Sequence, residues 1–122
     1  MSYYCECDER PEFCNEKPVV AARKQHECEE CRGKIQRGEG YVRHVGKWDG
    51  AMRQFKYCAR CQGVLDFIRA HIPCFCWTYG SVLDDALSIA ADANEDAPGL
   101  YFGVARRVVR ARRAATNVGR AS

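Results

Sequence analysis

No apolar stretch in this sequence is long enough to cross a bilayer, since a spanning helix needs about 18 or more consecutive apolar residues. The first ten residues (MSYYCECDER) contain no basic start, apolar run or cleavage site, so we expect no secretory leader. The sequence also lacks a glycine-rich phosphate loop and a nucleophile with a suitably spaced base. We therefore expect a non-enzymatic protein of the cytoplasm, with no membrane partner and no small-molecule substrate.

Cysteine, by contrast, is abundant, with 9 in 122 residues. Such a density is typical of disulfide-rich secreted proteins or of metal-binding intracellular ones. Because we expect no secretory leader, we interpret these cysteines as reduced thiols that bind metal. The length allows one domain with a modest core, which a bound metal would help to stabilise.

Four of the cysteines form two C-x-x-C motifs, Cys28 with Cys31 and Cys58 with Cys61. One tight turn brings two thiolates to a metal, and a tetrahedral shell needs a second such pair. The second pair opens a predicted helix, whose unpaired N–H groups and positive dipole stabilise thiolates. The spacing therefore predicts one structural Zn2+ with a closed shell. Four buried or redox-active thiols without metal are the alternative.

The remaining cysteines predict a second structural zinc site, which would bring the content to two Zn2+ per chain. Two C-x-C pairs flank the central motifs, and we expect them to supply the ligands. These are Cys5, Cys7, Cys74 and Cys76. Cys14 in place of Cys5 or Cys7 is the chief alternative, and an apolar corner of buried thiols is another. We expect the histidines to be structural residues rather than ligands; they are His26, His44 and His71.

The apolar pattern predicts a small α+β zinc-stabilised domain. Residues 40–45 and 52–57 alternate apolar and polar side chains around a Gly-Lys-Trp-Asp-Gly turn, which favours a β-hairpin. A helical stripe follows at 62–72 and ends before Pro73. Two further helices are expected, one at 81–91 and one from about Pro98.

Each of these last two helices carries a specific expectation. For the helix at 81–91, Ser81 and Asp84 form a variant of the capping box. The helix from Pro98 should bury one apolar face. That face comprises Leu100, Tyr101, Val104, Val108 and Ala111.

The expected organisation has four parts. An irregular N-terminal segment, 1–20, is anchored by the second metal site. The zinc finger occupies 21–80, two helices within 81–116 pack on it, and 117–122 form a disordered tail.

The turn that carries Cys28 and Cys31, here called the zinc knuckle, is followed by the hairpin and then by a helix. This order over 28–72 resembles the treble-clef zinc finger. Motifs along nearly the whole chain, among them RKQHECEEC at 23–31, FKYCARC at 55–61 and PCFCW at 73–77, resemble those of small bacteriophage and prophage zinc proteins. The resemblance supports the eight-cysteine ligand set and implies a viral accessory protein in the cytoplasm of the bacterial host. By analogy, such proteins bind and block a host protein, including components of host defence systems.

Two surfaces are candidates for binding a partner. At the hairpin tip, Lys47 and Trp48 lie in a predicted turn, where an exposed aromatic ring would anchor a host protein. The alternative is that Trp48 folds back onto the zinc knuckle. On the third helix, arginines at helical spacing form a stripe for DNA or RNA, or else a solvated face. The stripe comprises Arg106, Arg107, Arg110 and Arg113.

We expect a protein partner first, with nucleic acid as the alternative. A treble-clef nuclease is a third hypothesis. In some treble clefs a histidine of the hairpin holds a catalytic metal, and His44 lies in the predicted hairpin. The helix at 62–72 offers no His-Asn pair to complete such a centre, so we do not expect this activity.

Overall fold

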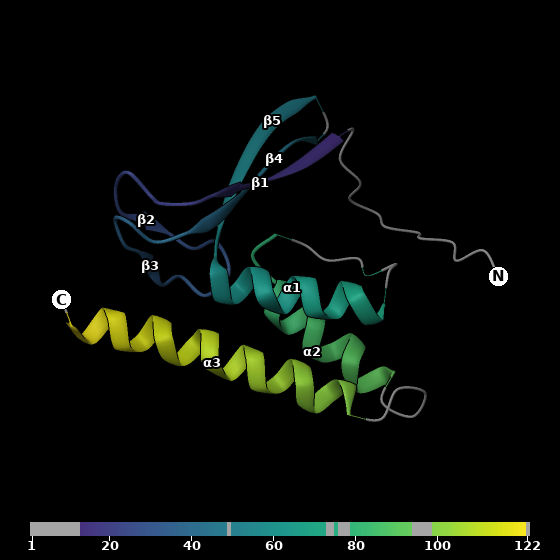
Figure 1. The fold of residues 1–122 in the computed structure, drawn as a ribbon. Coiled ribbons are helices and arrows are strands. Elements are labelled where there is room, and N and C mark those ends of the chain that lie inside the picture. The colour runs from purple at the N-terminus through teal and green to yellow at the C-terminus, as the bar shows by residue number, and fades with distance from the viewer. Residues whose placement is uncertain (1–12, 49, 73–74, 76–78, 94–98, 122) are drawn as a thin grey trace.

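The computed structural model describes residues 13–48, 50–72, 75, 79–93 and 99–121. These residues form an α+β fold in which the helices gather on one side of a β-sheet (Figure 1). The strands are β1 (Phe13–Val19), β2 (His26–Glu27), β3 (Lys34–Ile35), β4 (Tyr41–Trp48) and β5 (Ala51–Cys58). The helices are α1 (Ala59–His71), α2 (Val82–Asp92) and α3 (Leu100–Ala121).

The predicted hairpin is confirmed as β4 and β5, which pair antiparallel from Tyr41 opposite Cys58 to Trp48 opposite Ala51. Gly50 lies in the turn with φ +80, a value that favours glycine. β1 adds to the other side of β4, so the sheet has the order β1-β4-β5. A separate two-stranded ladder, β2-β3, flanks the loop that carries Cys28 and Cys31, here called the first cysteine loop.

The expectation of irregular chain throughout residues 1–20 is wrong for residues 13–19, which form β1. This segment has no apolar alternation of its own, and the exposed edge of β4 supplies the backbone partners that order it. Pro18 is tolerated because β1 is an edge strand. A bidentate ion pair between Glu16 and Arg69 of α1, with N–O distances of 2.7 and 2.8 Å, ties β1 to the helices.

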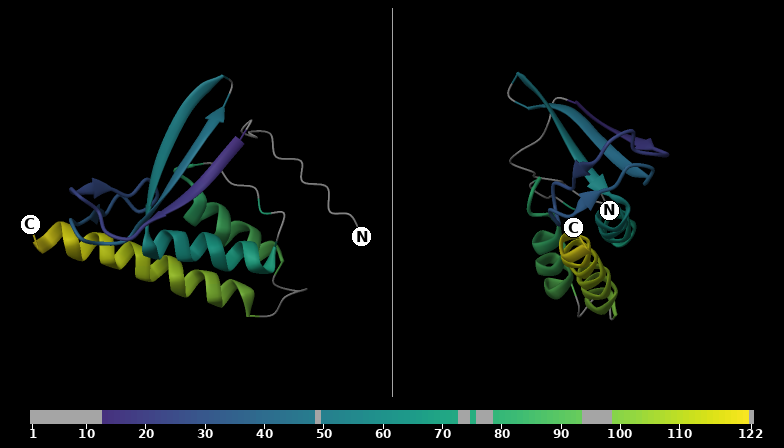
Figure 2. Two further views of the ribbon diagram at one scale, coloured as in Figure 1. Left: turned by 45° about the horizontal axis from the view of Figure 1, so that its top comes forward. Right: turned by 90° about the vertical axis from the view of Figure 1, so that its left-hand side faces the viewer.

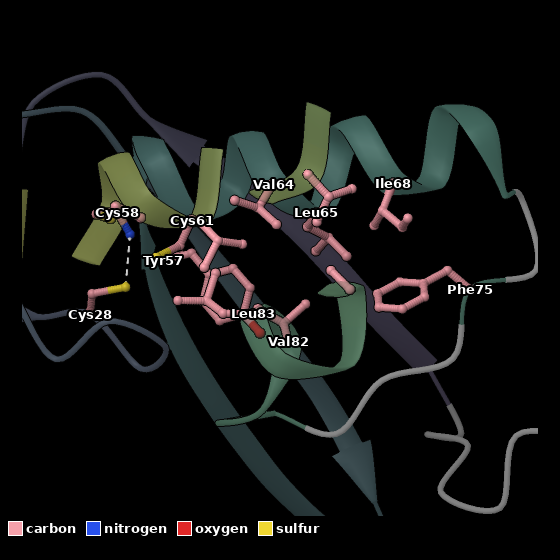
Figure 3. Close-up of a cluster of buried hydrophobic side chains, with 14 of the residues drawn as sticks. Cys28, Tyr57, Cys58, Cys61, Val64, Leu65, Ile68, Phe75, Val82 and Leu83 are labelled. Atoms are coloured by element: carbon pink, nitrogen blue, oxygen red, sulfur yellow. Dashed lines mark hydrogen bonds between the residues drawn. The ribbon is translucent and has the colours of Figure 1, made fainter. Parts of the chain in front are cut away.

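The core lies between the three helices and the adjacent end of the sheet (Figures 2 and 3). β5 runs directly into α1, so the hairpin and this helix share one buried layer. The fully buried side chains of this layer and of the facing helices include Tyr57, Val64, Leu65, Ile68, Val82, Val104 and Val108. The site described below lies at one end of this core, and Figure 3 shows Cys28, Cys58 and Cys61 there.

The third helix differs from expectation in two ways. It continues to Ala121, although residues 117–122 were expected to be a disordered tail. Ala115 packs on Gly33 of the first cysteine loop, and this contact with a fixed surface supports the continuation of the helix. The second difference is Tyr101, which was expected to be buried and is 38% exposed.

Candidate metal centre

The first cysteine pair lies in the loop between β2 and β3. Cys28 N–H donates to the Gly33 carbonyl at 2.9 Å, and Arg32 N–H donates to the Cys28 carbonyl at 3.1 Å. Arg32 adopts φ 62, a left-handed conformation that a non-glycine residue rarely takes and that closes the loop tightly. Gly33 N–H then points at the Cys31 sulfur, 3.4 Å away. The loop therefore turns both thiols of this pair to the same side.

Gly33 is needed because a side chain at this position would collide with α3. A Cβ atom at this position would lie 2.8 Å from the Ala115 Cβ and 2.9 Å from its Cα. The close approach of backbone to backbone brings α3 against the cysteine loop. The metal loop is thus packed on the third helix as well as on the hairpin.

The second pair lies where β5 becomes α1. Cys58 is the N-cap residue of α1 and Cys61 lies in its first turn. The backbone N–H of Cys58 donates to the Cys28 sulfur over 3.4 Å, drawn as the dashed line in Figure 3. The free N–H groups and the positive dipole of the helix start both favour thiolate over thiol. The position predicted from the spacing is confirmed.

The four sulfur atoms all lie within 4.8 Å of one another, close enough to hold one metal ion. Cys31 and Cys58, which come from different pairs, have their sulfurs 3.8 Å apart. Metal–sulfur bonds of about 2.3 Å at tetrahedral angles place sulfurs about 3.8 Å apart, so the cluster fits a four-thiolate shell. Three of the cysteines are buried and Cys31 is half-buried.

The proximity of the four thiols shifts their pKa values in different directions. The hydrogen bond from Cys31 lowers the pKa of Cys28, and the hydrogen bond from Cys28 lowers the pKa of Cys58 to about 7. The pKa of Cys61 is strongly raised, because the neighbouring sulfurs, Cys28 first, oppose a further negative charge. A divalent ion would remove this opposition, since a coordinating thiol is deprotonated outright.

Glu30 connects the first cysteine loop to the helices. Its carboxylate accepts hydrogen bonds from Tyr57 Oη at 2.5 Å, from Gly80 N–H at 2.6 Å and from Val82 N–H at 2.7 Å. Burial raises the pKa of this carboxyl, and the three donors act in the opposite direction. Glu30, one of the two residues between Cys28 and Cys31, therefore caps α2.

The predicted capping box of Ser81 and Asp84 is accordingly wrong. Ser81 is the N-cap residue by position, but its side chain makes no capping hydrogen bond. Glu30 accepts from the start of α2 instead. A carboxylate 52 positions away in sequence has no local signal, so the sequence pattern missed it.

The predicted second site lies outside the described residues. Its four ligands were expected to be Cys5, Cys7, Cys74 and Cys76, none of which the structure describes. Cys14 is described and exposed, with its sulfur 3.4 Å from Tyr79 Oη. In the described part of the chain, the central four cysteines are the group of His, Cys, Asp and Glu side chains that could hold a metal ion.

The three histidines have structural contacts. His44 is fully buried, with Nδ1 2.9 Å from Tyr79 Oη and Nε2 2.7 Å from Gln62 Oε1. Burial lowers its pKa, which favours the neutral form of the ring. His71 Nδ1 lies 2.9 Å from the Phe67 carbonyl, and the ring of His26 lies 5.2 Å from that of Tyr41.

The structure places the predicted hairpin-tip residues at the end of β4, and their binding to a protein stays a prediction. Trp48 is the last residue of β4, and its ring packs edge-on against Phe55 at 5.7 Å and Tyr79 at 5.5 Å. The indole neither stands free at a turn nor covers the zinc knuckle, because the aromatic face of its own sheet provides a nearer surface. Lys47, the other residue expected to bind protein, is half-buried in the same strand.

The predicted arginine stripe is only partly available. Arg106, Arg110 and Arg113 are exposed. The guanidinium of Arg107 instead lies 3.8 Å from the centre of the Phe67 ring and donates to the Gly103 carbonyl at 2.9 Å. Arg107 therefore packs α3 on α1.

Within the described residues, no helix combines the length and apolar character needed to cross a membrane. Comparison with known proteins found no match to a family model, to a curated protein or to a solved structure.

Proposed function

We propose that this protein is a non-enzymatic binding module whose fold is stabilised by Zn2+ at the four central cysteines. The observation that carries the proposal is the convergence of four sulfurs within 4.8 Å on a loop and a helix start. Four thiolates in a tetrahedron select zinc over harder ions and leave no position for a substrate or a catalytic water. The metal would then act on stability rather than on chemistry.

The order of the elements that supply the four cysteines supports the interpretation of this region as a treble-clef-like zinc finger. A cysteine loop between β2 and β3 supplies two ligands, the β4–β5 hairpin follows, and α1 supplies the other two. In such a finger the metal joins segments that would otherwise share few contacts. The second zinc of the predicted pair would join residues outside the described part of the chain.

The state of His44 supports a non-enzymatic role. A nuclease centre would need its imidazole free to bind a catalytic metal. Here both ring nitrogens are within hydrogen-bond distance of Tyr79 and Gln62, and the ring is fully buried. The residue is therefore engaged in joining the sheet to α1.

We propose that the partner is a protein, and that it contacts the exposed face of α3. Phe102 is 71% exposed and Val109 is 46% exposed, on the same helix face as three arginines. Those arginines are Arg106, Arg110 and Arg113. Exposed aromatic and arginine side chains are the residues that dominate protein interfaces. The resemblance to phage proteins makes a bacterial host protein, such as a defence component, the proposed target.

This helix face fits nucleic acid less well. The predicted stripe needed four arginines, and Arg107 is engaged with Phe67. Two large apolar side chains, Phe102 and Val109, also interrupt the remaining charges. A phosphate backbone gains little from apolar contact, whereas a protein groove does.

Site-specific crosslinking tests the α3 proposal. A photoreactive amino acid replaces Phe102 in one variant and Ser88, an exposed residue of α2, in a control variant. In nuclease-treated host lysate, we expect a discrete protein adduct from position 102 and not from position 88. Adding Arg106→Glu and Arg110→Glu should reduce the adduct at least tenfold, because the arginines contribute charge complementarity.

Two outcomes would contradict the proposal that the exposed face of α3 binds a protein. One is the same adducts from positions 102 and 88, which would indicate non-specific contact. The other is an adduct that disappears on nuclease treatment, which would identify nucleic acid as the ligand of α3.

A further inference from the structure

The sheet has an outer face that is directed away from the helices. Side chains alternate between the two faces along each strand. His44 of β4 points toward the helices, because it contacts Gln62 of α1, and Tyr57 of β5 is buried with it. The neighbouring residues Arg43 and Lys56 therefore point to the opposite face.

Three cations form one row across this outer face. Lys17 of β1 lies directly opposite Arg43 of β4, and Arg43 lies directly opposite Lys56 of β5. Adjacent strands are about 4.8 Å apart, so the three backbone positions span about 10 Å. Like charges directly opposite each other destabilise a sheet. The free protein therefore retains a repulsive arrangement where neutral residues would be more stable.

No acidic side chain offsets this row among the described outward positions of the three strands. Those positions are Asn15, Lys17, Val19, Arg43, Val45, Lys47, Met52, Gln54 and Lys56. Across the described chain, neither Lys17, Arg43 nor Lys56 is in an ion pair. The contrast with the inner face is sharp, because there Glu16 meets Arg69.

The guanidinium of Arg43 is also incompletely satisfied. One terminal nitrogen donates to Gln54 Oε1, which holds the side chain across the sheet. Its Nε–H is buried and has no hydrogen-bond partner in the described part of the chain. A buried donor without a partner is costly. An anion at the row would offset the charge repulsion among the three cations.

We propose that Lys17, Arg43 and Lys56 form a binding site for the phosphate backbone of a nucleic acid. Phosphates carry closely spaced fixed charges, which a flat row of three cations complements. The exposed amides of Asn15 and Gln54 flank the row and can hydrogen-bond phosphate or sugar oxygens. Lysine is depleted in protein–protein interfaces, so two lysines at the site favour nucleic acid over an acidic protein.

This site is separate from the α3 face and does not depend on the protein-binding proposal. Its residues belong to β1, β4 and β5, whereas the α3 face belongs to one helix. Backbone contacts carry no sequence information directly, so the binding should be independent of base sequence. The chain would then hold a protein partner and a nucleic acid on different surfaces.

Fluorescence anisotropy with a short DNA duplex and with single-stranded RNA tests the site. Three phosphate contacts predict a slope of log K against log salt of about −2.7 on duplex, a fall of about 40-fold between 50 and 200 mM salt. The triple variant Lys17→Gln, Arg43→Gln, Lys56→Gln should lose at least tenfold in affinity and most of this slope. Its melting temperature should stay equal or rise, because the repulsion is removed.

A helix variant with the same loss of charge is the matched control: Arg106→Gln, Arg110→Gln, Arg113→Gln. It should keep wild-type affinity for nucleic acid and lose the protein crosslink, so the two proposals fail separately. No binding by the wild type at low salt would overturn the sheet site. So would an equal loss of affinity in both triple variants, or competition by polyglutamate as effective as by nucleic acid, which would indicate an acidic protein.

Discussion

The Cys28→Ser variant should yield little folded protein. Cys28 is fully buried, and its sulfur is within 4.8 Å of the other three. Structural zinc contributes on the order of 10 kcal/mol of apparent folding free energy in small fingers, and small domains are stable by only about 5–15 kcal/mol. Far-UV and near-UV circular dichroism of the purified variant, with and without added Zn2+, would measure the loss.

Cys14→Ser is the matched control for this prediction. It removes the same atom from an exposed cysteine outside the central cluster. We expect this variant to fold and to retain zinc at the central site. A Cys28→Ser protein as soluble and as thermally stable as Cys14→Ser would show that the central site does not stabilise the fold.

The Glu30→Ala variant should lose about 3 kcal/mol of stability while retaining metal. The substitution leaves Tyr57 Oη and the N–H groups of Gly80 and Val82 without their acceptor. Each unsatisfied buried donor costs about 1–3 kcal/mol, and solvent reaching the exposed Gly80 reduces the total. Urea unfolding followed by circular dichroism would measure the difference from wild type.

Two milder substitutions separate the contributions to this network. Tyr57→Phe removes one donor and should cost about 1 kcal/mol. Glu30→Gln retains a carbonyl acceptor and should fall between the wild type and Glu30→Ala. If Glu30→Ala were as stable as the wild type, the carboxylate would not be the link between the cysteine loop and α2.

The parts of the fold that were predicted from the sequence rest on local patterns. The β4–β5 hairpin follows from side-chain alternation around a glycine-bearing turn, and the start of α1 follows from Cys58 and Cys61. The cysteine cluster was predictable because each C-x-x-C pair is set by one turn. The local spacing therefore indicated the ligands without knowledge of the path between them.

The features that were missed depend on residues far apart in the chain. β1 exists because β4 offers it an edge, and Glu16 then meets Arg69, 53 positions later. Glu30 caps α2 across 52 positions. Neither contact leaves a periodic or motif signal, since the partner is chosen by the three-dimensional fold.

The positions of side chains with two plausible environments could also not be predicted from the sequence. Trp48 could have been free or turned onto the knuckle, and the position of Tyr79 determined a third arrangement. Arg107 and Arg106 are neighbours on one helix, yet only Arg107 faces the Phe67 ring. The row of cations on the sheet required the register of three strands, which no single strand reveals.

The central claim is that the four central cysteines hold a structural zinc ion. Zinc-edge X-ray absorption on a variant with four fewer cysteines tests it most directly. In this variant, the four residues of the expected second site are all replaced by serine. They are Cys5, Cys7, Cys74 and Cys76. If Cys28, Cys31, Cys58 and Cys61 hold structural zinc, the variant should bind one equivalent with four sulfur ligands at about 2.3 Å. A folded variant without zinc, or a shell containing nitrogen or oxygen, would contradict it.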